Sequence, residues 1–283
     1  MNTSHRIFFE LQKEPFIADI AHKEILETPE IKGVENRICY AISIGSVALI
    51  TGEIGSGKST ALRYVSGKLH PSEYRIIHVT ASNGSILELY RNILGELDLD
   101  PVGSSRTRMT RQIKQEIKDT VIGKKMKIVL IIDEASLLRL EVFAELHTLT
   151  QFENDSKPFL PIVLAGQANL VDNLKYRYSM PLASRVVGRC HLQGVDKQGM
   201  ENYLLHHLSI AGVHKNLFES AAITAIHQGA GGLFRKANHL ARGAIIVAAQ
   251  AKSLQVLADH VRIAATEIFW VRLFCDMTDN KFL

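Results

Sequence analysis

The sequence is poor in cysteine and has no long apolar run, and each lack excludes a class of protein. Its three cysteines, Cys39, Cys190 and Cys275, lie far apart and form no CxxC pair. This argues against a disulfide framework or a zinc site and fits a reducing cytosol. No segment approaches the roughly 18 apolar residues of a membrane helix, and the charged N-terminal stretch MNTSHRIFFELQKEPF lacks a signal-peptide core. We expect a cytoplasmic protein without a membrane segment.

What is present is the composition of an ordinary globular protein. The 283 residues are 46% apolar and 22% charged, which argues against disorder. That length suits one large domain, or a core domain with a smaller companion. The net charge of +4 permits nucleic-acid binding without requiring it, so the local distribution of charge must decide.

Short runs of branched apolar residues predict five strands: SVALIT (46–51), RIIHVT (75–80), KIVLIID (127–133), LPIVLAG (160–166) and GRCHL (188–192). Stretches with helical spacing separate the first four, and this alternation indicates a parallel, doubly wound sheet. From about Asp196 onward only helical patterns follow. The sequence therefore predicts an α/β domain over residues 1–193 and a helical unit over residues 194–283.

The stretch GEIGSGKST matches the phosphate-loop pattern GxxxxGK[ST], with a predicted strand before it and a helix after it. Glycines let the backbone curl so that successive N–H groups face an anion, and the helix adds its positive end. Lys58 would neutralise the β- and γ-phosphates, and the Ser59 hydroxyl would bind Mg²⁺. The expected ATP contacts are Gly52, Glu53, Ile54, Gly55, Ser56, Gly57, Lys58, Ser59, Thr60 and Asp133.

Two carboxylates end the third predicted strand, in KIVLIIDEAS. Beside the phosphate loop, Asp133 would hold Mg²⁺ through water, and Glu134 would orient and deprotonate the attacking water. One acidic residue at this point suits many nucleotide-binding proteins. The pair Asp133–Glu134 favours an ATPase that uses water as the nucleophile, although two solvent-facing carboxylates are the structural alternative.

In this order the motifs resemble the AAA+ ATPases. More narrowly, EPF (Glu14 to Phe16), LITGEIGSGKST, LIIDEASLL, VLAGQANL and GGLFRKANHLARGA resemble the branch that contains general secretion pathway protein A and the target-selection ATPases of Mu-like transposons. The resemblance covers roughly residues 8 to 268. It implies a P-loop AAA+ domain, in which a five-stranded parallel sheet lies between helices, followed by a small all-α lid. It also implies a homo-oligomer whose adjacent subunits complete each other's sites.

The resemblance also implies two sensor residues. Gln167 follows the fourth strand, where the family places a polar side chain near the γ-phosphate or the attacking water; Asn169 is the alternative. Arg235 starts a helix where the family places its second sensor, which reaches from the lid to the γ-phosphate. This sequence has Phe234 where the family commonly has proline, a departure that should not move the arginine.

An arginine finger is the third implied element. In the family, this planar cation enters a neighbouring subunit's site and offsets the charge that develops on the transferred phosphate. Arg185, just before the last predicted strand, matches the family position best, with Arg189 and Arg177 as fallbacks. For each of these residues, the alternative is a surface arginine that forms a salt bridge and has no catalytic role.

Basic residues dominate SSRTRMTRQIKQEIKDTVIGKKMK, which lies between the second and third predicted strands. On a helix, Arg111, Lys114 and Lys118 would share one face. We expect contacts with the backbone of double-stranded DNA from Arg106, Thr107, Arg108, Arg111 and Lys114. Without aromatic residues or a base-reading pattern, such binding would be weakly sequence-selective. A solvated helix face explains the charge equally well, and the family resemblance tips the balance toward DNA.

These expectations lead to one main function and one alternative. The main one is a DNA-binding AAA+ regulator that assembles with ATP as a ring or helical filament on target DNA and recruits or activates a transposase, while hydrolysis dismantles it. The alternative is a secretion-associated ATPase that energises assembly of envelope machinery. The family's secretion proteins continue into a membrane helix and a peptidoglycan-binding segment, and the absence of both before Leu283 favours the first. The Asp133–Glu134 pair disfavours a switch with negligible turnover.

Two features of the second half of the chain are expected to be structural rather than functional. His206 and His207 are adjacent, so they point in different directions on a helix and make a poor metal pair; surface positions are expected. The amphipathic tail ADHVRIAATEIFWVRLF, with the only tryptophan, Trp270, is expected to pack against the helical unit rather than dock a partner.

Overall fold

The computed structural model describes residues 4–267, so Trp270 and Cys275 lie outside the described residues. Contacts within the chain divide it into two units. The α/β unit comprises Glu27–Glu53 and Lys58–Leu192. The helical unit comprises the chain up to Leu26, the turn Ile54–Gly57 and the chain from Gln193 onward. Within residues 4–267, no helix combines the length and the apolarity needed to cross a membrane.

The α/β unit has a five-stranded parallel sheet, as the alternating pattern predicts, and the structure gives its strand order as β2-β3-β4-β1-β5. Its strands are β1 (Val47–Gly52), β2 (Tyr74–Thr80), β3 (Lys127–Asp133), β4 (Ile162–Gly166) and β5 (Val186–Leu192). Its helices and helical turns are α2 (Pro29–Ile44), α3 (Lys58–Lys68), α4 (Ile86–Glu96), α5 (Arg106–Lys118), the π turn η2 (Asp119–Gly123), the 3₁₀ turn η3 (Ala135–Leu137), α6 (Leu140–Thr150), α7 (Asn169–Lys175) and α8 (Met180–Ala183).

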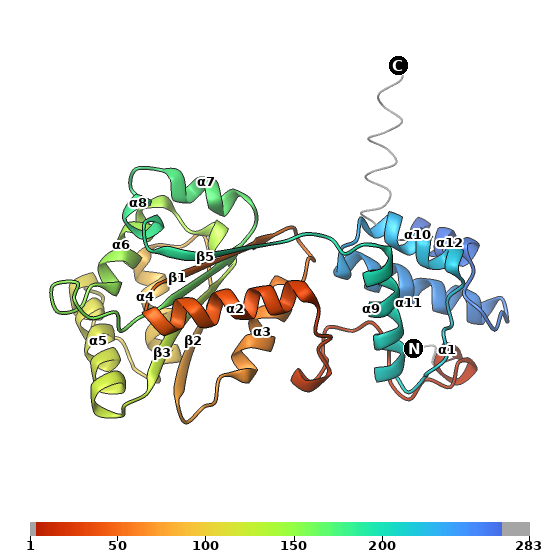
Figure 1. The fold of residues 1–283 in the computed structure, drawn as a ribbon, viewed down its shortest axis with the longest axis horizontal. Coiled ribbons are helices and arrows are strands. Elements are labelled where there is room, and N and C mark those ends of the chain that lie inside the picture. Colours follow the sequence, from red (N-terminus) through yellow and green to blue (C-terminus); the bar gives the residue numbers. More distant parts are fainter. Residues whose placement is uncertain (1–3, 268–283) are drawn as a thin grey trace, which may run out of the picture. The chain divides into compact units, whose positions relative to one another are not determined.

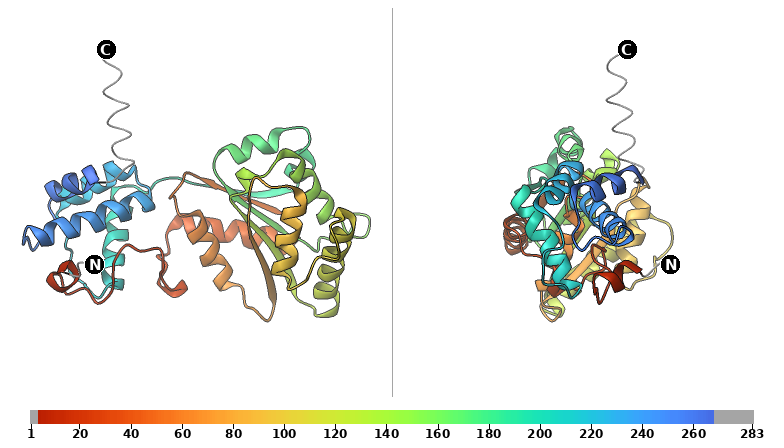
Figure 2. Two further views of the ribbon diagram at one scale, coloured as in Figure 1. Left: turned by 180° about the vertical axis from the view of Figure 1, so that it is seen from behind. Right: turned by 90° about the vertical axis from the view of Figure 1, so that its right-hand side faces the viewer.

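Helices cover both faces of this sheet. Helices α2 and α3 lie in front of it in Figure 1, and α4 lies in front of it when the unit is seen from behind in Figure 2. Helices α4 to α8 share one continuous core with the sheet residues on their side, including Leu130 and Leu164. Because both faces are covered, the central strands are buried along nearly their whole length, which explains their continuous apolar runs.

Parallel pairing brings the carboxyl ends of the central strands to one edge. Thr51 of β1 lies opposite Gly166 of β4, and Ile132 of β3 lies opposite Leu164 of β4. The residues that follow these strands, among them Glu53, Glu134 and Gln167, therefore emerge along one edge of the sheet. In open α/β sheets this edge is where ligands bind.

The helical unit contains α1 (Ser4–Phe8), the 3₁₀ turn η1 (His22–Glu24), α9 (Lys197–Ile210), α10 (Ser220–Ala230), α11 (Phe234–Gln250) and α12 (Ala258–Glu267). The sequence predicts only helices here, but Phe218 and Val256 form an isolated parallel β-bridge. The N-terminal segment, which the sequence assigned to the α/β domain, belongs here by its contacts. Phe9, Leu11 and Phe16 pack in the core of this unit, and burial of their apolar surface accounts for the difference.

The expectation that both adjacent histidines of α9 lie at the surface is wrong for His207. His207, expected at the surface, is only 3% exposed, stacks on Phe16 with ring centroids 5.4 Å apart and lies 4.4 Å from the ring of Tyr203. Burial lowers the pKa of His207 to about 4, so the imidazole is neutral near pH 7. The His206 ring contacts the carbonyl oxygen of Glu24 through Nε2 at 2.6 Å. As expected, the two side chains diverge; they are packing residues of the helical unit.

Candidate nucleotide site and basic helix

The phosphate loop follows β1 and runs directly into the first turn of α3. Gly55 and Gly57 have φ values of +85° and +97°, the left-handed region where glycine carries no penalty. Helix α3 begins at Lys58, so the orphan N–H groups of its first turn belong to the motif itself. The buried Lys58 ammonium group donates to the carbonyl oxygens of Gly52 at 3.0 Å and Glu53 at 2.9 Å. This curl, cation and helix end form a phosphate cradle.

A pair of oxygen donors links the phosphate loop to β3. The Ser59 hydroxyl donates to Asp133 Oδ2 at 2.7 Å, and Asp133 Oδ1 accepts from the backbone N–H of Glu134 at 2.8 Å. A hydroxyl beside a carboxylate suits Mg²⁺, which prefers oxygen and takes few protein ligands when it binds with nucleotide phosphates. Among the described residues, no three His, Cys, Asp or Glu side chains gather as a protein-only metal site. The donor set therefore fits a nucleotide-bound Mg²⁺.

Glu134 stands just past the end of β3 in an unusual backbone conformation. Its φ of +52° and ψ of +32° are left-handed, which costs free energy for a residue with a side chain. Residues held in this way cluster at functional sites. The side chain is half-buried, whereas Asp133 beside it is only 6% exposed. The two adjacent carboxylates thus meet different environments.

A serine that the sequence analysis missed joins β3 to β4. The Ser136 hydroxyl accepts from the backbone N–H of Gln167 at 3.3 Å, and its carbonyl oxygen accepts from the Asn173 side chain at 3.3 Å. A Cβ at Gly166 would lie 2.8 Å from the backbone nitrogen of Ser136, so only glycine fits this approach. Gln167 itself is half-buried, while Asn169 is exposed at the start of α7. Ser136 therefore fixes the backbone that carries Gln167.

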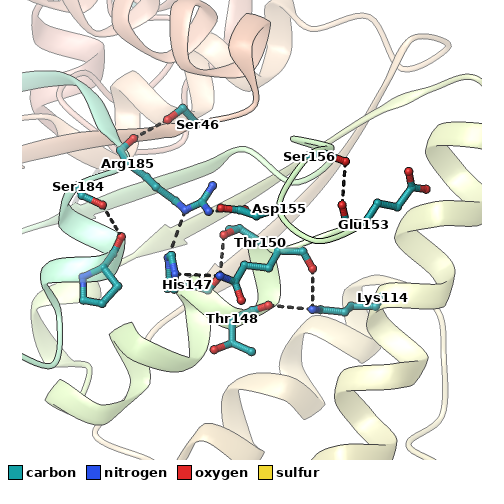
Figure 3. Close-up of polar contacts among 12 residues, drawn as sticks. Ser46, Lys114, His147, Thr148, Thr150, Glu153, Asp155, Ser156, Ser184 and Arg185 are labelled. Carbon is teal, nitrogen blue, oxygen red and sulfur yellow. Dashed lines mark hydrogen bonds and ion pairs between the residues drawn. The ribbon is translucent and has the colours of Figure 1, made fainter.

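The three finger candidates differ in their surroundings. Arg185 is 22% exposed; its guanidinium pairs with Asp155, and its Nε donates to His147 Nδ1 at 3.2 Å, as Figure 3 shows. The same contact helps to hold the pKa of the Asp155 carboxyl below its usual value. Arg177, after α7, and Arg189, on β5, are exposed. Arg185 is thus the candidate with specific partners in its own chain.

Arg235 is the second residue of α11 in the helical unit, and its side chain is exposed. Its backbone N–H donates to the carbonyl oxygen of Gly55 at 3.3 Å, within the same unit. Helix α11 starts directly after a turn in which Gly231 and Gly232 are both left-handed. Arg235 therefore lies at the start of a helix, as the resemblance implies.

The basic stretch forms helix α5, held against the α/β core by Met109, Ile113 and Ile117, all fully buried. The opposite side carries the predicted DNA-contacting residues. Arg106, Thr107, Arg108 and Arg111 are exposed, and Arg106 pairs with Glu145 at 3.0 Å. A groove of about 490 Å³ beside α5 is lined by Arg106, Thr107, Arg111, Lys114 and Lys118 together with residues of α6 and the segment after it, which include the acidic Glu145 and Glu153. The predicted shared face of Arg111, Lys114 and Lys118 is confirmed.

Lys114 differs from its neighbours on α5. Its ammonium group donates to the carbonyl oxygens of Thr148 and Gln151, each at 2.8 Å, and lies 5.4 Å from the centroid of the Phe152 ring. A cation at the last carbonyls of α6 complements the negative end of that helix. Burial, with Lys118 nearby, lowers the Lys114 pKa from its usual value. Lys114 therefore already binds a partner within the chain.

The strand order, the phosphate loop after β1 and the acidic residues at the end of β3 define a P-loop ATPase domain. More specifically, residues 44–174 match the family model described as AAA domain. The chain is 27% identical over 268 residues to general secretion pathway protein A of Aeromonas hydrophila. That match covers 94% of this chain and 48% of the relative, so the chain spans about half the relative's length.

Solved structures show the same fold. Cdc6p from Pyrobaculum aerophilum matches with a TM-score of 0.71 and 14% identity, covering 95% of this chain and 71% of that one. The ORC1 protein of Aeropyrum pernix in complex with DNA matches with 0.66 and 16%, covering 89% and 68%. The RuvB Holliday junction branch migration motor of Thermotoga maritima matches with 0.54 and 17%, covering 89% and 72%. The fold is that of the P-loop AAA+ ATPases, a domain class of ATP-hydrolysing enzymes.

Proposed function

We propose that this protein is a DNA-binding AAA+ ATPase that assembles with itself on double-stranded DNA when it binds ATP and disassembles on hydrolysis. Its main proposed role is to regulate transposition by recruiting or activating a transposase. The observation that carries this proposal is the face of α5, where exposed cations line one groove while the opposite side of the helix is anchored in the core. Cations held on a rigid element suit recognition of a phosphate backbone without base selectivity.

The proposed catalytic roles follow the chemistry of each group. The N–H groups of the loop and Lys58 bind the phosphates, and Ser59 with Asp133 holds Mg²⁺, which when bound would offset charge on the β- and γ-oxygens. Glu134 takes the proton of the attacking water, and Gln167 orients that water or the γ-phosphate. Arg235 acts as the lid sensor. Arg185 acts in trans on a neighbouring subunit, which makes assembly a condition for turnover.

DNA-dependent assembly is the direct test. We would follow oligomer formation by mass photometry and electron microscopy with ATP, with and without a random-sequence duplex. The expected result is assembly that duplex DNA promotes and that weakens steeply with salt. Replacing both Arg108 and Arg111 with alanine should lower the slope of log affinity against log salt by about two. Lys197 and Lys215, exposed in the helical unit, give a matched double-alanine control that removes the same charge. Indifference of the wild type to duplex DNA at low salt would refute DNA binding.

The secretion-associated function remains a second candidate because of one observation, the identity to general secretion pathway protein A across 94% of this chain. It proposes an ATPase that energises assembly of envelope machinery. ATP-driven assembly without any response to duplex DNA would favour it. A transposase gene beside the coding sequence would favour the main proposal instead.

A further inference from the structure

A continuous series of polar contacts connects the basic helix α5 to Arg185. Lys114 Nζ binds the carbonyl oxygens of Thr148 and Gln151. The side-chain nitrogen Nε2 of Gln151 lies 3.2 Å from His147 Nε2, and His147 Nδ1 accepts from Arg185 Nε at 3.2 Å. Figure 3 shows Lys114 at one side of this series and Arg185 with Asp155 at the other. We call it the Lys114–Arg185 relay.

The chemistry of the imidazole fixes the direction of these bonds. Arg185 Nε–H can only donate, so His147 Nδ1 must be unprotonated. A neutral imidazole then carries its proton on Nε2. That proton faces Gln151 Nε2, which is also a donor, so the Gln151 amide must be turned to present its oxygen as the acceptor. Burial and the Arg185 guanidinium both lower the pKa of His147, which favours this neutral form. His147 therefore acts as a bridge with one donor and one acceptor site.

The backbone around Arg185 is fixed even though its side chain faces polar partners. Its carbonyl oxygen accepts from the Ser46 hydroxyl and from the backbone N–H of Val47 at 3.0 Å, which joins it to the start of β1. Only the side chain can move without breaking the sheet. In the relay its Nε and one terminal nitrogen are both bound to groups of its own chain. These bonds use two of the five guanidinium N–H groups and orient the side chain toward its own chain rather than toward another subunit.

The other end of the relay contains a group that a phosphate would compete for. Lys114 lines the same groove as Arg106 and Arg111, so an anion in that groove lies near an ammonium group that is held by two carbonyl oxygens and the face of the Phe152 ring. A charged phosphate oxygen is a stronger partner for an ammonium group than a neutral carbonyl oxygen. Loss of Lys114 would release Gln151 and, through it, the segment that carries Asp155. That segment has three successive left-handed residues, Glu153, Asn154 and Asp155, so it is under backbone strain.

We propose that His147 is a positioning residue for Arg185, and that the relay holds Arg185 in its own chain until a DNA phosphate draws Lys114 away. This inference rests on the proposed function, in which α5 binds DNA and Arg185 is the trans finger. It changes the role of Lys114 from a simple phosphate contact to the input of a two-position switch. Arg185 is withheld in free subunits and released in DNA-bound ones.

The test compares ATP hydrolysis with and without a saturating random-sequence duplex. His147→Leu removes the acceptor for Arg185 while filling a similar space, whereas His147→Asn keeps an oxygen near the position of Nδ1. We expect His147→Leu to raise hydrolysis without DNA about tenfold, because one hydrogen bond to a charged group is lost. Stimulation by DNA should shrink by the same factor. His147→Asn should restore the wild-type ratio, which a purely structural defect would not do.

Two lysine variants separate the relay from plain DNA affinity. Lys114→Met should lose stimulation in the same way as His147→Leu, and the double variant should be no worse than the stronger single, since both break one relay. Lys118→Met removes the same charge one turn further along α5. It should weaken DNA affinity and leave stimulation at saturating DNA unchanged.

Histidine NMR gives a readout that does not depend on turnover. Wild-type His147 should show the Nε2–H tautomer, and Lys114→Met should shift the His147 nitrogen resonances whereas Lys118→Met should not. If the wild type binds DNA and His147→Leu is stimulated as strongly, the relay is refuted and the proposed function stands. If the wild type binds no DNA, both fail together. If Lys114→Met leaves the His147 resonances unchanged, the connection between the two ends is refuted whatever DNA does.

Discussion

Two groups of polar side chains, one in the α/β unit and one in the helical unit, lie in contrasting environments. In the α/β unit, Asp133 at the end of β3 pairs with the Ser59 hydroxyl, and Arg185 just before β5 pairs with Asp155. In the helical unit two ionisable rings lie inside an aromatic cluster, and burial moves the pKa of His207 to about 4 and that of Tyr203 to about 12. The first arrangement keeps charge available, and the second suppresses it. Substitutions of Asp133 or Arg185 should therefore change activity, whereas those of His207 or Tyr203 should change stability.

Arg185 offers the largest effect with which to test this contrast. We expect Arg185→Ala to lower ATP hydrolysis by about 10³–10⁵-fold, the range for an arginine finger, with the chain still folded. Mixing this variant with Lys58→Ala subunits should restore part of the activity, because some interfaces then pair an intact loop with an intact arginine. Hydrolysis measured over a series of mixing ratios checks this.

Arg177 and Arg189 are matched controls for that experiment. Both are exposed arginines close to Arg185 in sequence, and their alanine variants should retain most of the activity. No recovery at any ratio would count against Arg185 as the finger. Recovery with Arg177→Ala or Arg189→Ala instead would move the assignment.

Glu134 gives the next largest effect. Glu134→Gln keeps the size of the side chain and removes the base, so hydrolysis should fall by about 10²–10⁴-fold while ATP binding persists. ATP affinity and single-turnover rates measured together distinguish this from a binding defect. Glu141→Gln, an exposed position in the first turn of α6, is the control. Normal turnover by Glu134→Gln would refute its assignment as the base.

Features that depend on a short stretch of chain could be predicted from the sequence. A phosphate loop is a local device: Gly55 and Gly57 need left-handed backbone, Lys58 and Ser59 must follow at once, and the flanking strand and helix have their own periodicity. The pattern and the geometry are therefore nearly the same information. Buried parallel strands are equally readable, and the predicted strand runs coincide closely with β1 to β5.

Contacts between distant segments could not be read in this way. The charge pattern of α5 treats Lys114 and Lys118 alike, yet only the fold brings the end of α6 to Lys114. Nothing in the sequence marks Ser136 as the partner of Gln167, or places the N-terminal Phe16 beside His207. These outcomes depend on tertiary packing. A helical pattern alone gives the apolar face of a helix without naming what covers it.

His207 should make the stability of the protein depend on pH. With a native pKa of about 4 against about 6.5 in the unfolded chain, the unfolded state binds the extra proton between these values. Stability is therefore retained above pH 6.5 and falls as the pH drops, by about 2 kcal/mol between pH 7 and pH 5 for this residue. Urea denaturation over that range should show a smaller fall for His207→Phe, which keeps an aromatic ring against Phe16. An unchanged fall would mean that His207 is not the titrating group.

The smallest expected effects come from removing a helix N-cap, a contact that occurs in both units. The side chain of Thr28 caps α2 by accepting from the backbone N–H of Ile31 at 3.3 Å, and that of Asp196 caps α9 by accepting from the backbone N–H of Gly199 at 2.7 Å. Each alanine variant should cost about 1 kcal/mol, which raises amide exchange through local opening roughly fivefold. Hydrogen exchange with peptide resolution should place the change at α2 for Thr28→Ala and at α9 for Asp196→Ala. Because each cap stabilises a helix of a different unit, exchange that rises in both units for either variant would show that the two units open together.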